Sequence, residues 1–196
     1  VPEYIRSFLT NSKNKIFFES NKIMILISNY SSIKVCLDKL KFHNFCKINN
    51  IPSIKILSQK EYVNKNVKLV VKERFSFEKG FIIINKSYAQ IKKHLHKFKN
   101  PIIQKYIPGN EISVDAFMDE NFKVIGIVMR SRDYVVDGES QVTSIFKNKE
   151  MEKKFVTYFE ALKISGSAML QAKIYKDKIF VIECNPRLGG ATSLSI

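Results

Sequence analysis

The chain has 196 residues and a formal net charge of +15, a balance that favours anionic partners such as a nucleotide polyphosphate or a nucleic acid. Hydrophobic residues make up 45% of it and include 15 Phe, which is enough for one core or for two small lobes around a cleft. No stretch is long and apolar enough to cross a bilayer, and the three cysteines form no Cys-x-x-Cys pair, so we expect no membrane partner, no zinc or disulfide framework, and a cytoplasmic protein with reduced thiols.

In the first half of the chain, short apolar runs alternate with amphipathic segments. Apolar periodicity predicts helices at residues 3–11, 31–49 and 87–98. It predicts strands at residues 22–27, 53–57, 67–72, 81–85 and 101–106. Serines stand where the second and third helices would begin, at Ser31-Ser32 and Ser87, and serine is a preferred N-cap residue.

The second half contains two pairs of strands and one helix. We expect a hairpin at 111–129, a long loop at 130–148, a helix at 149–162 and a second hairpin at 166–184. Strands and helices that fall into separate blocks indicate an α+β fold with antiparallel sheets.

The last predicted strand ends in a group of polar residues. Glu183 and Asn185 are two residues apart, so in an extended segment both side chains point to the same face. Pro186 then ends the strand, and Arg187 follows. Two oxygen ligands beside a cation suit Mg²⁺ that holds a polyphosphate. The alternative is an ordinary polar strand end followed by a turn.

Other segments resemble the ATP-grasp enzymes in the same order along the chain, from about residue 31 to the end. They are Asp38-Lys39, Val70-Val71-Lys72, the run from Ile102 to Glu111, Gly166, Gln171 and the Glu183-to-Arg187 segment. The branch that the chain resembles most is that of the carbamoyl phosphate synthetase large subunit. The resemblance implies an α+β ATP-grasp fold, with two lobes whose antiparallel sheets enclose a nucleotide cleft. Residues 1–30 would be the remnant of a preceding domain, 31–106 the first lobe, and 107–196 the second lobe with the metal site.

Residues of the front half are assigned to ATP by this resemblance. Lys72 ends an apolar strand, where an ammonium group needs an anionic partner such as a phosphate oxygen, unless it reaches solvent. Lys39 would be a second cation near the phosphates, although an Asp-Lys pair arises readily by chance in a lysine-rich helix. Glu111 would accept hydrogen bonds from the ribose, or is a plain carboxylate at a strand start. Adenine recognition would use the backbone of Gln104, Lys105, Tyr106 and Ile107.

Residues of the back half would bind the metal and the phosphoryl group. The metal, Mg²⁺ or in its place Mn²⁺, would be held by Gln171, Glu183 and Asn185, with Gln171 also next to the nucleotide. Arg187, together with Lys72, would neutralise charge on the transferred phosphoryl group. Arg132 shares a strand face with Arg130, and a pair of guanidinium groups suits phosphate or carboxylate recognition. The alternative for this arginine pair is a basic surface loop.

The function implied by the resemblance is an ATP- and Mg²⁺-dependent ligation that joins a carboxylate to an amine or a thiol through an acylphosphate. The substrates would be small molecules, nucleic acid is not expected as a partner, and the full-length protein could be a homodimer. The segment at 73–80 keeps only Gly80 where the family has several glycines that close around phosphates. This difference leaves open a nucleotide-binding module without turnover. The net charge leaves open a second alternative, a basic nucleic-acid-binding domain.

Overall fold

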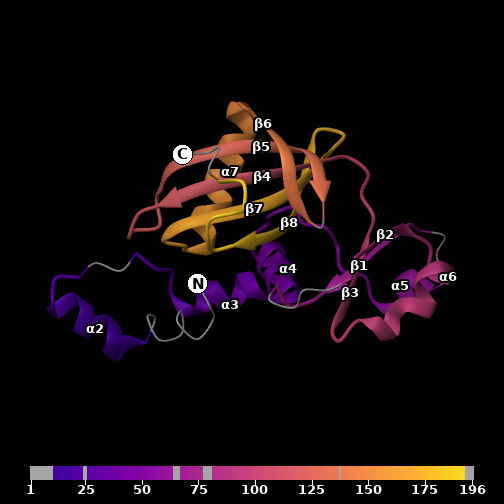
Figure 1. Ribbon diagram of the computed structural model, residues 1–196, viewed down its shortest axis with the longest axis horizontal. Coiled ribbons are helices and arrows are strands. Elements are labelled where there is room, and N and C mark those ends of the chain that lie inside the picture. The colour runs from indigo at the N-terminus through magenta and orange to yellow at the C-terminus, as the bar shows by residue number, and fades with distance from the viewer. Residues whose placement is uncertain (1–10, 24–25, 64–66, 77–80, 137, 193–196) are drawn as a thin grey trace.

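The computed structural model describes residues 11–23, 26–63, 67–76, 81–136 and 138–192. It contains two antiparallel sheets that lie side by side (Figure 1). The larger sheet has the strand order β6-β5-β4-β7-β8, and the smaller one has the order β2-β1-β3. The large sheet consists of β4 (Asn110–Met118), β5 (Val124–Val136), β6 (Glu139–Phe146), β7 (Gly166–Tyr175) and β8 (Lys178–Asn185). The small sheet consists of β1 (Leu69–Glu73), β2 (Ile83–Lys86) and β3 (Pro101–Lys105).

The helices divide between the two sheets. The large sheet is covered by α3 (Tyr30–Leu37), α4 (Lys39–Ile48) and α7 (Lys149–Leu162). The small sheet carries α5 (Gln59–Val63), α6 (Tyr88–Ile91) and the 3₁₀ helix η1 (Lys92–Lys97). Helix α2 (Ser12–Ser20) lies apart from both (Figure 1). No helix among the described residues is long and apolar enough to cross a membrane.

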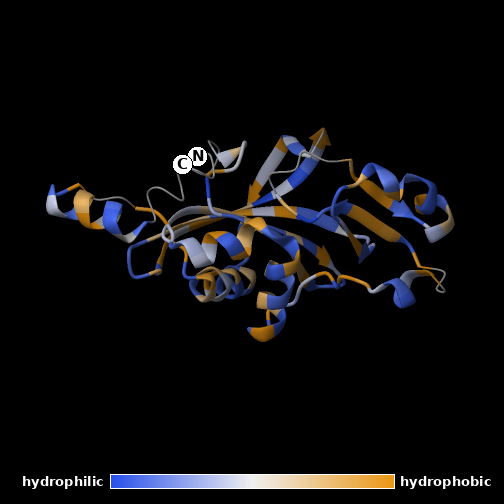
Figure 2. Ribbon diagram, turned by 90° about the horizontal axis from the view of Figure 1, so that it is seen from below, coloured by the Kyte–Doolittle hydropathy of each residue, from blue (hydrophilic) through white to orange (hydrophobic). Residues whose placement is uncertain are grey.

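Alternation along β4 creates the two faces of the large sheet. Ile112, Val114 and Ala116 are buried in the core beneath the helices, which lie to one side of this sheet in Figure 2. Because neighbouring side chains in a strand point to opposite faces, Glu111, Ser113 and Asp115 lie on the other face. The face that is not covered by helices is therefore lined with polar groups. A separate core, which includes Leu69 and Ile103, lies under the small sheet. The predicted α+β architecture with antiparallel sheets is confirmed.

The predicted helix 31–49 is broken into two. Asp38 is extended, with φ −116° and ψ 105°, and its carboxylate caps the second helix through Leu40 N and Lys41 N. The first of the two helices is capped by Asn29 rather than by the serines that follow it. Both helices pack with the large sheet, whereas the sequence placed residues 31–106 in one lobe. The domain boundaries remain a prediction, but the core formed by α3 and α4 belongs with the second half of the chain.

The predicted loop 130–148 is wrong. Strand β5 continues to Val136 and pairs with β6, so that Arg132 lies opposite Thr143. The residues of this ribbon are mostly exposed, with Tyr134 and Val142 among them. Apolar patterning could not find it because the strands lack a buried face over this stretch.

Several shorter predictions also differ from the structure. Residues 53–57 form only isolated bridges, one of them a parallel contact between Ser53 and Val181. Helix α5 was not predicted, and the helix expected at 87–98 divides into α6 and η1. Ser87 does precede α6 as its N-cap. The helix expected at 3–11 lies almost wholly outside the described residues. Of the strand expected at 22–27, the described part is not in a sheet.

Candidate functional site

A cavity of about 840 Å³ is lined by residues of both sheets. The small sheet contributes Lys72 and the end of β3, the start of α4 contributes Lys39, and the large sheet contributes residues of its polar face. The cavity is lined by ten of the residues predicted for the site: Lys39, Lys72, Gln104, Lys105, Tyr106, Ile107, Glu111, Arg132, Gln171 and Glu183. The other two predicted residues, Asn185 and Arg187, are not among those that line it. Segments from both halves of the chain thus converge in one space.

Two lysines from the front half of the chain approach one carboxylate from the back half. Lys39 Nζ lies 3.5 Å from Glu183 Oε2, and the lysine and glutamate side chains are 10% and 19% exposed. Lys72, on β1, is also buried. A cluster of two cations and one anion keeps a positive excess, which favours a further anionic group beside it.

Burial sets the ionisation of this cluster. It lowers the pKa of Lys72 to about 8, because desolvation and the charge of Lys39 outweigh the attraction of Glu183 and Glu111. Burial by itself would raise the pKa of Glu183, but Lys72 and Lys39 outweigh that effect, so this pKa lies below its usual range. Glu183 is therefore ionised at neutral pH.

The donor set predicted for the metal fits one ion of the Mg²⁺ type. Gln171 and Glu183 are register partners on β7 and β8, and Asn185 Nδ2 donates to Glu183 Oε1 at 3.3 Å. One carboxylate and two carboxamides are hard oxygen donors, and Mg²⁺ commonly takes one or two carboxylates together with substrate phosphates. Among the described residues, there is no group of three or more His, Cys, Asp or Glu side chains that could hold a metal without such help.

The end of β3 lies along the cavity and carries no carboxylate. The buried Gln104 donates from Nε2 to Ile54 O at 3.0 Å, so its side chain is used within the protein. Tyr106 N donates to Lys68 O at 2.8 Å, which fixes the start of the connection to β4. Lys105 is exposed. Gln104, Lys105, Tyr106 and Ile107 all line the cavity. Adenine recognition by their backbone remains a prediction.

Glu111 already has two cationic neighbours. Arg132 Nε lies 3.0 Å from Glu111 Oε1, and Lys173 Nζ lies 3.9 Å from Glu111 Oε2. Arg132 Nη2 also donates to Gly138 O at 2.7 Å, and so connects β5 to the turn that precedes β6. Lys173 lines the cavity but was missed in the sequence. Its spacing of two residues from Gln171 on one strand was the available signal.

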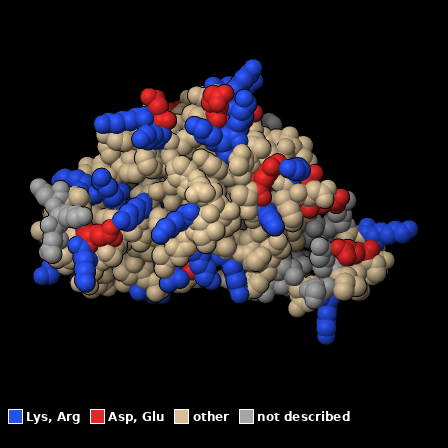
Figure 3. Space-filling view, turned by 180° about the vertical axis from the view of Figure 1, so that it is seen from behind, with Lys and Arg blue, Asp and Glu red and all other residues tan. Residues whose placement is uncertain are grey.

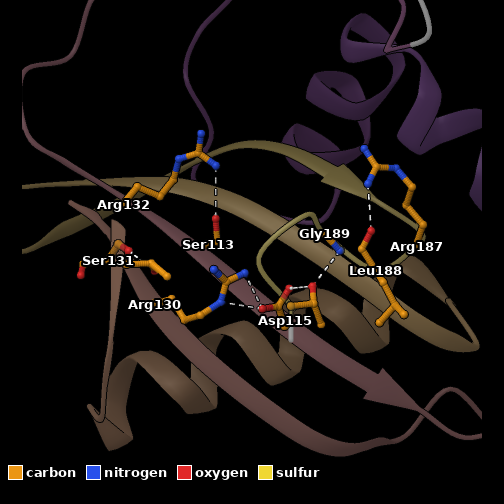
Figure 4. A network of polar contacts seen from close by, with 10 residues as sticks. Ser113, Asp115, Arg130, Ser131, Arg132, Arg187, Leu188 and Gly189 are labelled. Carbon is orange, nitrogen blue, oxygen red and sulfur yellow. Dashed lines mark hydrogen bonds and ion pairs between the residues drawn. The ribbon is translucent and has the colours of Figure 1, made fainter. Parts of the chain in front are cut away.

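A second network lies further along the polar face of the large sheet (Figure 4). Arg130 is 1% exposed and binds Asp115 through Nε at 2.8 Å and Nη2 at 2.6 Å. Thr192 Oγ1 donates to the other Asp115 oxygen at 3.1 Å and accepts from Gly189 N at 2.7 Å. Asp115 was not singled out in the sequence. This network holds the segment after β8 against the sheet.

Arg187 does not line the cavity. It is exposed, and its Nη1 donates to Leu188 O at 2.8 Å. In Figure 4 it lies on the opposite side of the network from Arg132. Its assignment to the phosphoryl group remains a prediction.

On one face of the molecule, positive charge is spread rather than gathered (Figure 3). On the face drawn in Figure 3, lysines and arginines are scattered among uncharged residues, with acidic residues between them. A continuous basic groove would be expected for a protein that follows a nucleic-acid backbone. This face therefore gives no support to the nucleic-acid alternative.

Comparison with known proteins identifies the family. Residues 97–196, slightly more than half of the chain, match the family described as "ATP-grasp in the biosynthetic pathway with Ter operon". The carbamoyl phosphate synthase large chain of Clostridium acetobutylicum is 29% identical over 198 residues, which cover 90% of this chain and 18% of that protein. The corresponding protein of Clostridium botulinum is 37% identical over 98 residues, 45% of this chain and 9% of the relative. The chain thus spans less than a fifth of the length of these relatives.

Solved structures agree on the fold. Biotin carboxylase from Campylobacter jejuni, solved as a β-γ-ATP complex, has a TM-score of 0.73 at 14% identity and covers 96% of this chain and 49% of its own. D-alanine–D-alanine ligase from Bacillus anthracis, complexed with ATP, has a TM-score of 0.67 at 19% identity, with 94% of this chain and 65% of its own covered. The predicted resemblance is confirmed, and the chain belongs to the ATP-grasp family.

Proposed function

We propose that this chain binds ATP with Mg²⁺ in the cavity between its two sheets and uses it as an ATP-dependent ligase. The observation that carries the proposal is the approach of Lys39 to within 3.5 Å of Glu183, beside the buried Lys72. The net positive charge of the three groups suits a triphosphate, and the oxygen donors beside Glu183 suit the metal that accompanies it. Mn²⁺ has the same ligand preferences and is a second candidate.

The reaction proposed is the joining of a small carboxylate to an amine or a thiol. The substrate carboxylate attacks the γ-phosphorus, the bond to the β-γ bridging oxygen breaks, and ADP leaves. The amine or thiol then displaces phosphate from the acylphosphate. Lys39 and Lys72 would hold the phosphates, and Arg132 would hold the carboxylate or the phosphoryl oxygens from its place on the cavity wall. Positioning and neutralisation of charge, without a protein nucleophile, would supply the acceleration.

Gln171, Glu183 and Asn185 would hold the metal, which when bound would neutralise charge on the phosphates. The adenine would lie along the backbone of residues 104–107. Glu111 would accept hydrogen bonds from the ribose hydroxyls. Its two oxygens also contact Arg132 and Lys173, so the ribose would share them with these cations.

The first experiment measures ATP binding by calorimetry, with and without Mg²⁺. The proposal expects the metal to strengthen ATP binding, and it expects this strengthening to be lost in Glu183→Gln. Turnover is then tested by incubating the protein with ATP, hydroxylamine and a panel of small carboxylates. An acylphosphate is captured as a hydroxamate, so a carboxylate that yields both ADP and hydroxamate supports the ligase. Absence of ATP binding in the wild-type protein would contradict the proposal.

A second candidate function is a nucleotide-binding module without turnover. It is favoured by the sequence of the 73–80 segment, in which Arg74, Phe75 and Phe77 stand where phosphate-closing glycines are expected. This candidate predicts metal-dependent ATP binding, but neither ADP nor hydroxamate with any carboxylate of the panel. The same two measurements therefore separate the candidates.

A further inference from the structure

The last two residues of β1, Lys72 and Glu73, and the residue that follows, Arg74, have different polar partners. Lys72 lines the cavity. Glu73 accepts from Lys99 N and Asn100 N, each at 2.9 Å, on the turn before β3. Arg74 reaches α3 and α4 instead, where it meets Asp38. The end of β1 is thus held on both sides of the strand. Lys72 and Glu73 both line the cavity, but the Glu73 carboxylate is already bound to the turn before β3.

The contact between Arg74 and Asp38 is two-pronged. Arg74 Nε donates to Asp38 Oδ1 at 2.8 Å, and Nη2 donates to Oδ2 at 2.7 Å. Asp38 Oδ1 also accepts from Leu40 N at 3.0 Å and Lys41 N at 3.2 Å at the start of α4. The Asp38 side chain is 6% exposed. A bidentate guanidinium–carboxylate contact fixes orientation as well as distance, so the arginine fixes the helix start relative to β1.

The backbones on either side of this contact are also joined. Lys39 N donates to Arg74 O at 3.0 Å, and Ser76 N donates to Leu37 O at 3.0 Å. Lys39 Nζ lies 3.5 Å from Ser76 Oγ. Lys39 directly follows Asp38 in the sequence, and Lys72 stands two residues before Arg74. The contact between the two elements sets the separation of the two lysines.

That separation needs a constraint because the two lysines carry like charges. Both face Glu183, and the charge of Lys39 contributes to the lowered pKa of Lys72. Repulsion between neighbouring cations in a buried place favours their moving apart. The Arg74–Asp38 pair opposes this movement from outside the cavity, since Arg74 itself is not among the residues that line it.

We infer that Arg74 is a positioning residue, whose two-pronged contact with Asp38 holds Lys39 and Lys72 at the spacing that a triphosphate requires. The inference rests on the proposed function, because it concerns how the phosphates are received. It extends that function to a residue outside the cavity, in the segment where the chain lacks the family's glycines.

The test compares ligands with and without phosphates. Affinities for Mg²⁺–ATP and for adenosine are measured by calorimetry for the wild-type protein, Arg74→Gln and Arg74→Lys. We expect Arg74→Gln to weaken Mg²⁺–ATP binding about tenfold, within the usual range for coupled neighbours, and to leave adenosine binding unchanged. Arg74→Lys keeps the charge but not the two-pronged geometry, so part of the affinity should return. A merely structural role would weaken both ligands together.

A double variant adds a second readout. Because Arg74 acts through Lys39, Lys39→Ala with Arg74→Gln should bind Mg²⁺–ATP no more weakly than Lys39→Ala alone. Lys153→Gln removes an exposed lysine of another ion pair and is the matched control with unchanged affinities. If Arg74→Gln does not fold, Arg74→Lys tests the inference instead. A lowered ratio of its Mg²⁺–ATP affinity to its adenosine affinity, relative to the wild-type protein, supports a positioning role.

Two results would overturn the inference in distinguishable ways. If the wild-type protein binds Mg²⁺–ATP and the ratio of the two affinities is the same in the folded variants, Arg74 is not a positioning residue, and the proposed function stands. If the wild-type protein does not bind Mg²⁺–ATP, the proposed function and this inference are both lost.

Discussion

Lys39 Nζ lies 3.5 Å from Glu183 Oε2, although one residue follows the break between α3 and α4 and the other lies near the end of β8. The ion pair has a consequence for metal binding. The carboxylate that would bind a metal is already neutralised in part by lysine, so a metal has to compete with the ammonium group. An incoming triphosphate changes this balance, because it offers the lysine another anionic partner.

Replacement of Glu183 by Gln should abolish the metal dependence of ATP binding. The remaining donors, Gln171 and Asn185, are neutral and would not hold a divalent cation without the carboxylate. Titration of ATP binding with and without Mg²⁺ measures the effect. Glu150→Gln is the matched control, since that carboxylate is 79% exposed and its removal leaves the cavity unchanged. A Glu183→Gln protein that keeps full metal-dependent binding would refute the metal assignment.

The buried Lys72 should make the folded protein more stable as the pH rises from about 8 towards 10.5. Its pKa is lowered from 10.5 to about 8 on folding, so between these values the unfolded chain binds a proton that the folded protein lacks. Stability then rises with pH, by at most about 1.4 kcal/mol per pH unit. Urea unfolding of the wild-type protein and of Lys72→Met across this range gives the difference.

The comparison with Lys72→Met isolates this lysine, because other groups that titrate in the same range do so in both proteins. The wild-type curve should rise relative to that of the variant between about pH 8 and 10.5 and run parallel to it below pH 8. A difference that stays constant across the whole range would mean that Lys72 is not shifted in the folded protein.

Much of the second half of the fold could be predicted from the sequence, and the reason is periodicity. Strands β7 and β8 have buried residues at regular spacing around a tight turn, and α7 has Phe155 and Phe159 on one buried side. The break at Asp38 was not predicted. There the Asp38 carboxylate caps α4 and also binds Arg74, which lies far away in the sequence. Apolar residues continue through the break, so the pattern indicated one helix.

The candidate site divides in the same way. Residues that end strands and point into the cavity, such as Lys72 and Glu183, could be found from strand patterns and from the family resemblance. Lys173 was missed although its spacing from Gln171 on one strand was a usable signal. Arg74 could not be found, because its partner Asp38 is brought close only by the fold. Arg187 is the reverse case, because the sequence indicated it for the site and the structure does not bring it there. Its position fits the family segment, but its guanidinium donates to Leu188 O.

Removal of one partner of the buried Arg130–Asp115 pair should lower the free energy of unfolding much more than replacement of both partners by apolar residues. Arg130→Met leaves the 6%-exposed Asp115 without its guanidinium partner, and removal of one partner from a buried pair costs about 3–5 kcal/mol. The double variant Arg130→Met with Asp115→Leu should lose markedly less, because no charge remains buried. Urea unfolding of the three proteins checks this.

An exposed ion pair is the control for that series. Lys123 and Glu160 lie 3.2 Å apart, and the lysine side chain is 69% exposed, so Lys123→Met should change stability by no more than about 1 kcal/mol. A double variant that is as unstable as Arg130→Met alone would show that Arg130 stabilises the sheet by packing rather than by its charge contact.

Gly109→Ala should destabilise the connection between the two sheets. Gly109 has φ +139°, and a Cβ there would lie 2.2 Å from the Ile174 carbonyl oxygen on β7. The backbone conformation alone costs roughly 1–3 kcal/mol for a residue with a side chain, which corresponds to a decrease of about 5 °C in Tm for a chain of this size. Gly126→Ala on β5 is the matched control, since nothing lies within 4 Å of its added Cβ.

Because Gly109 O accepts from Lys173 Nζ at 3.2 Å, displacement of this turn should also weaken ATP binding. Equal Tm values for the two variants would mean that the turn adapts to a side chain, and Gly109 would then not fix the connection between the sheets.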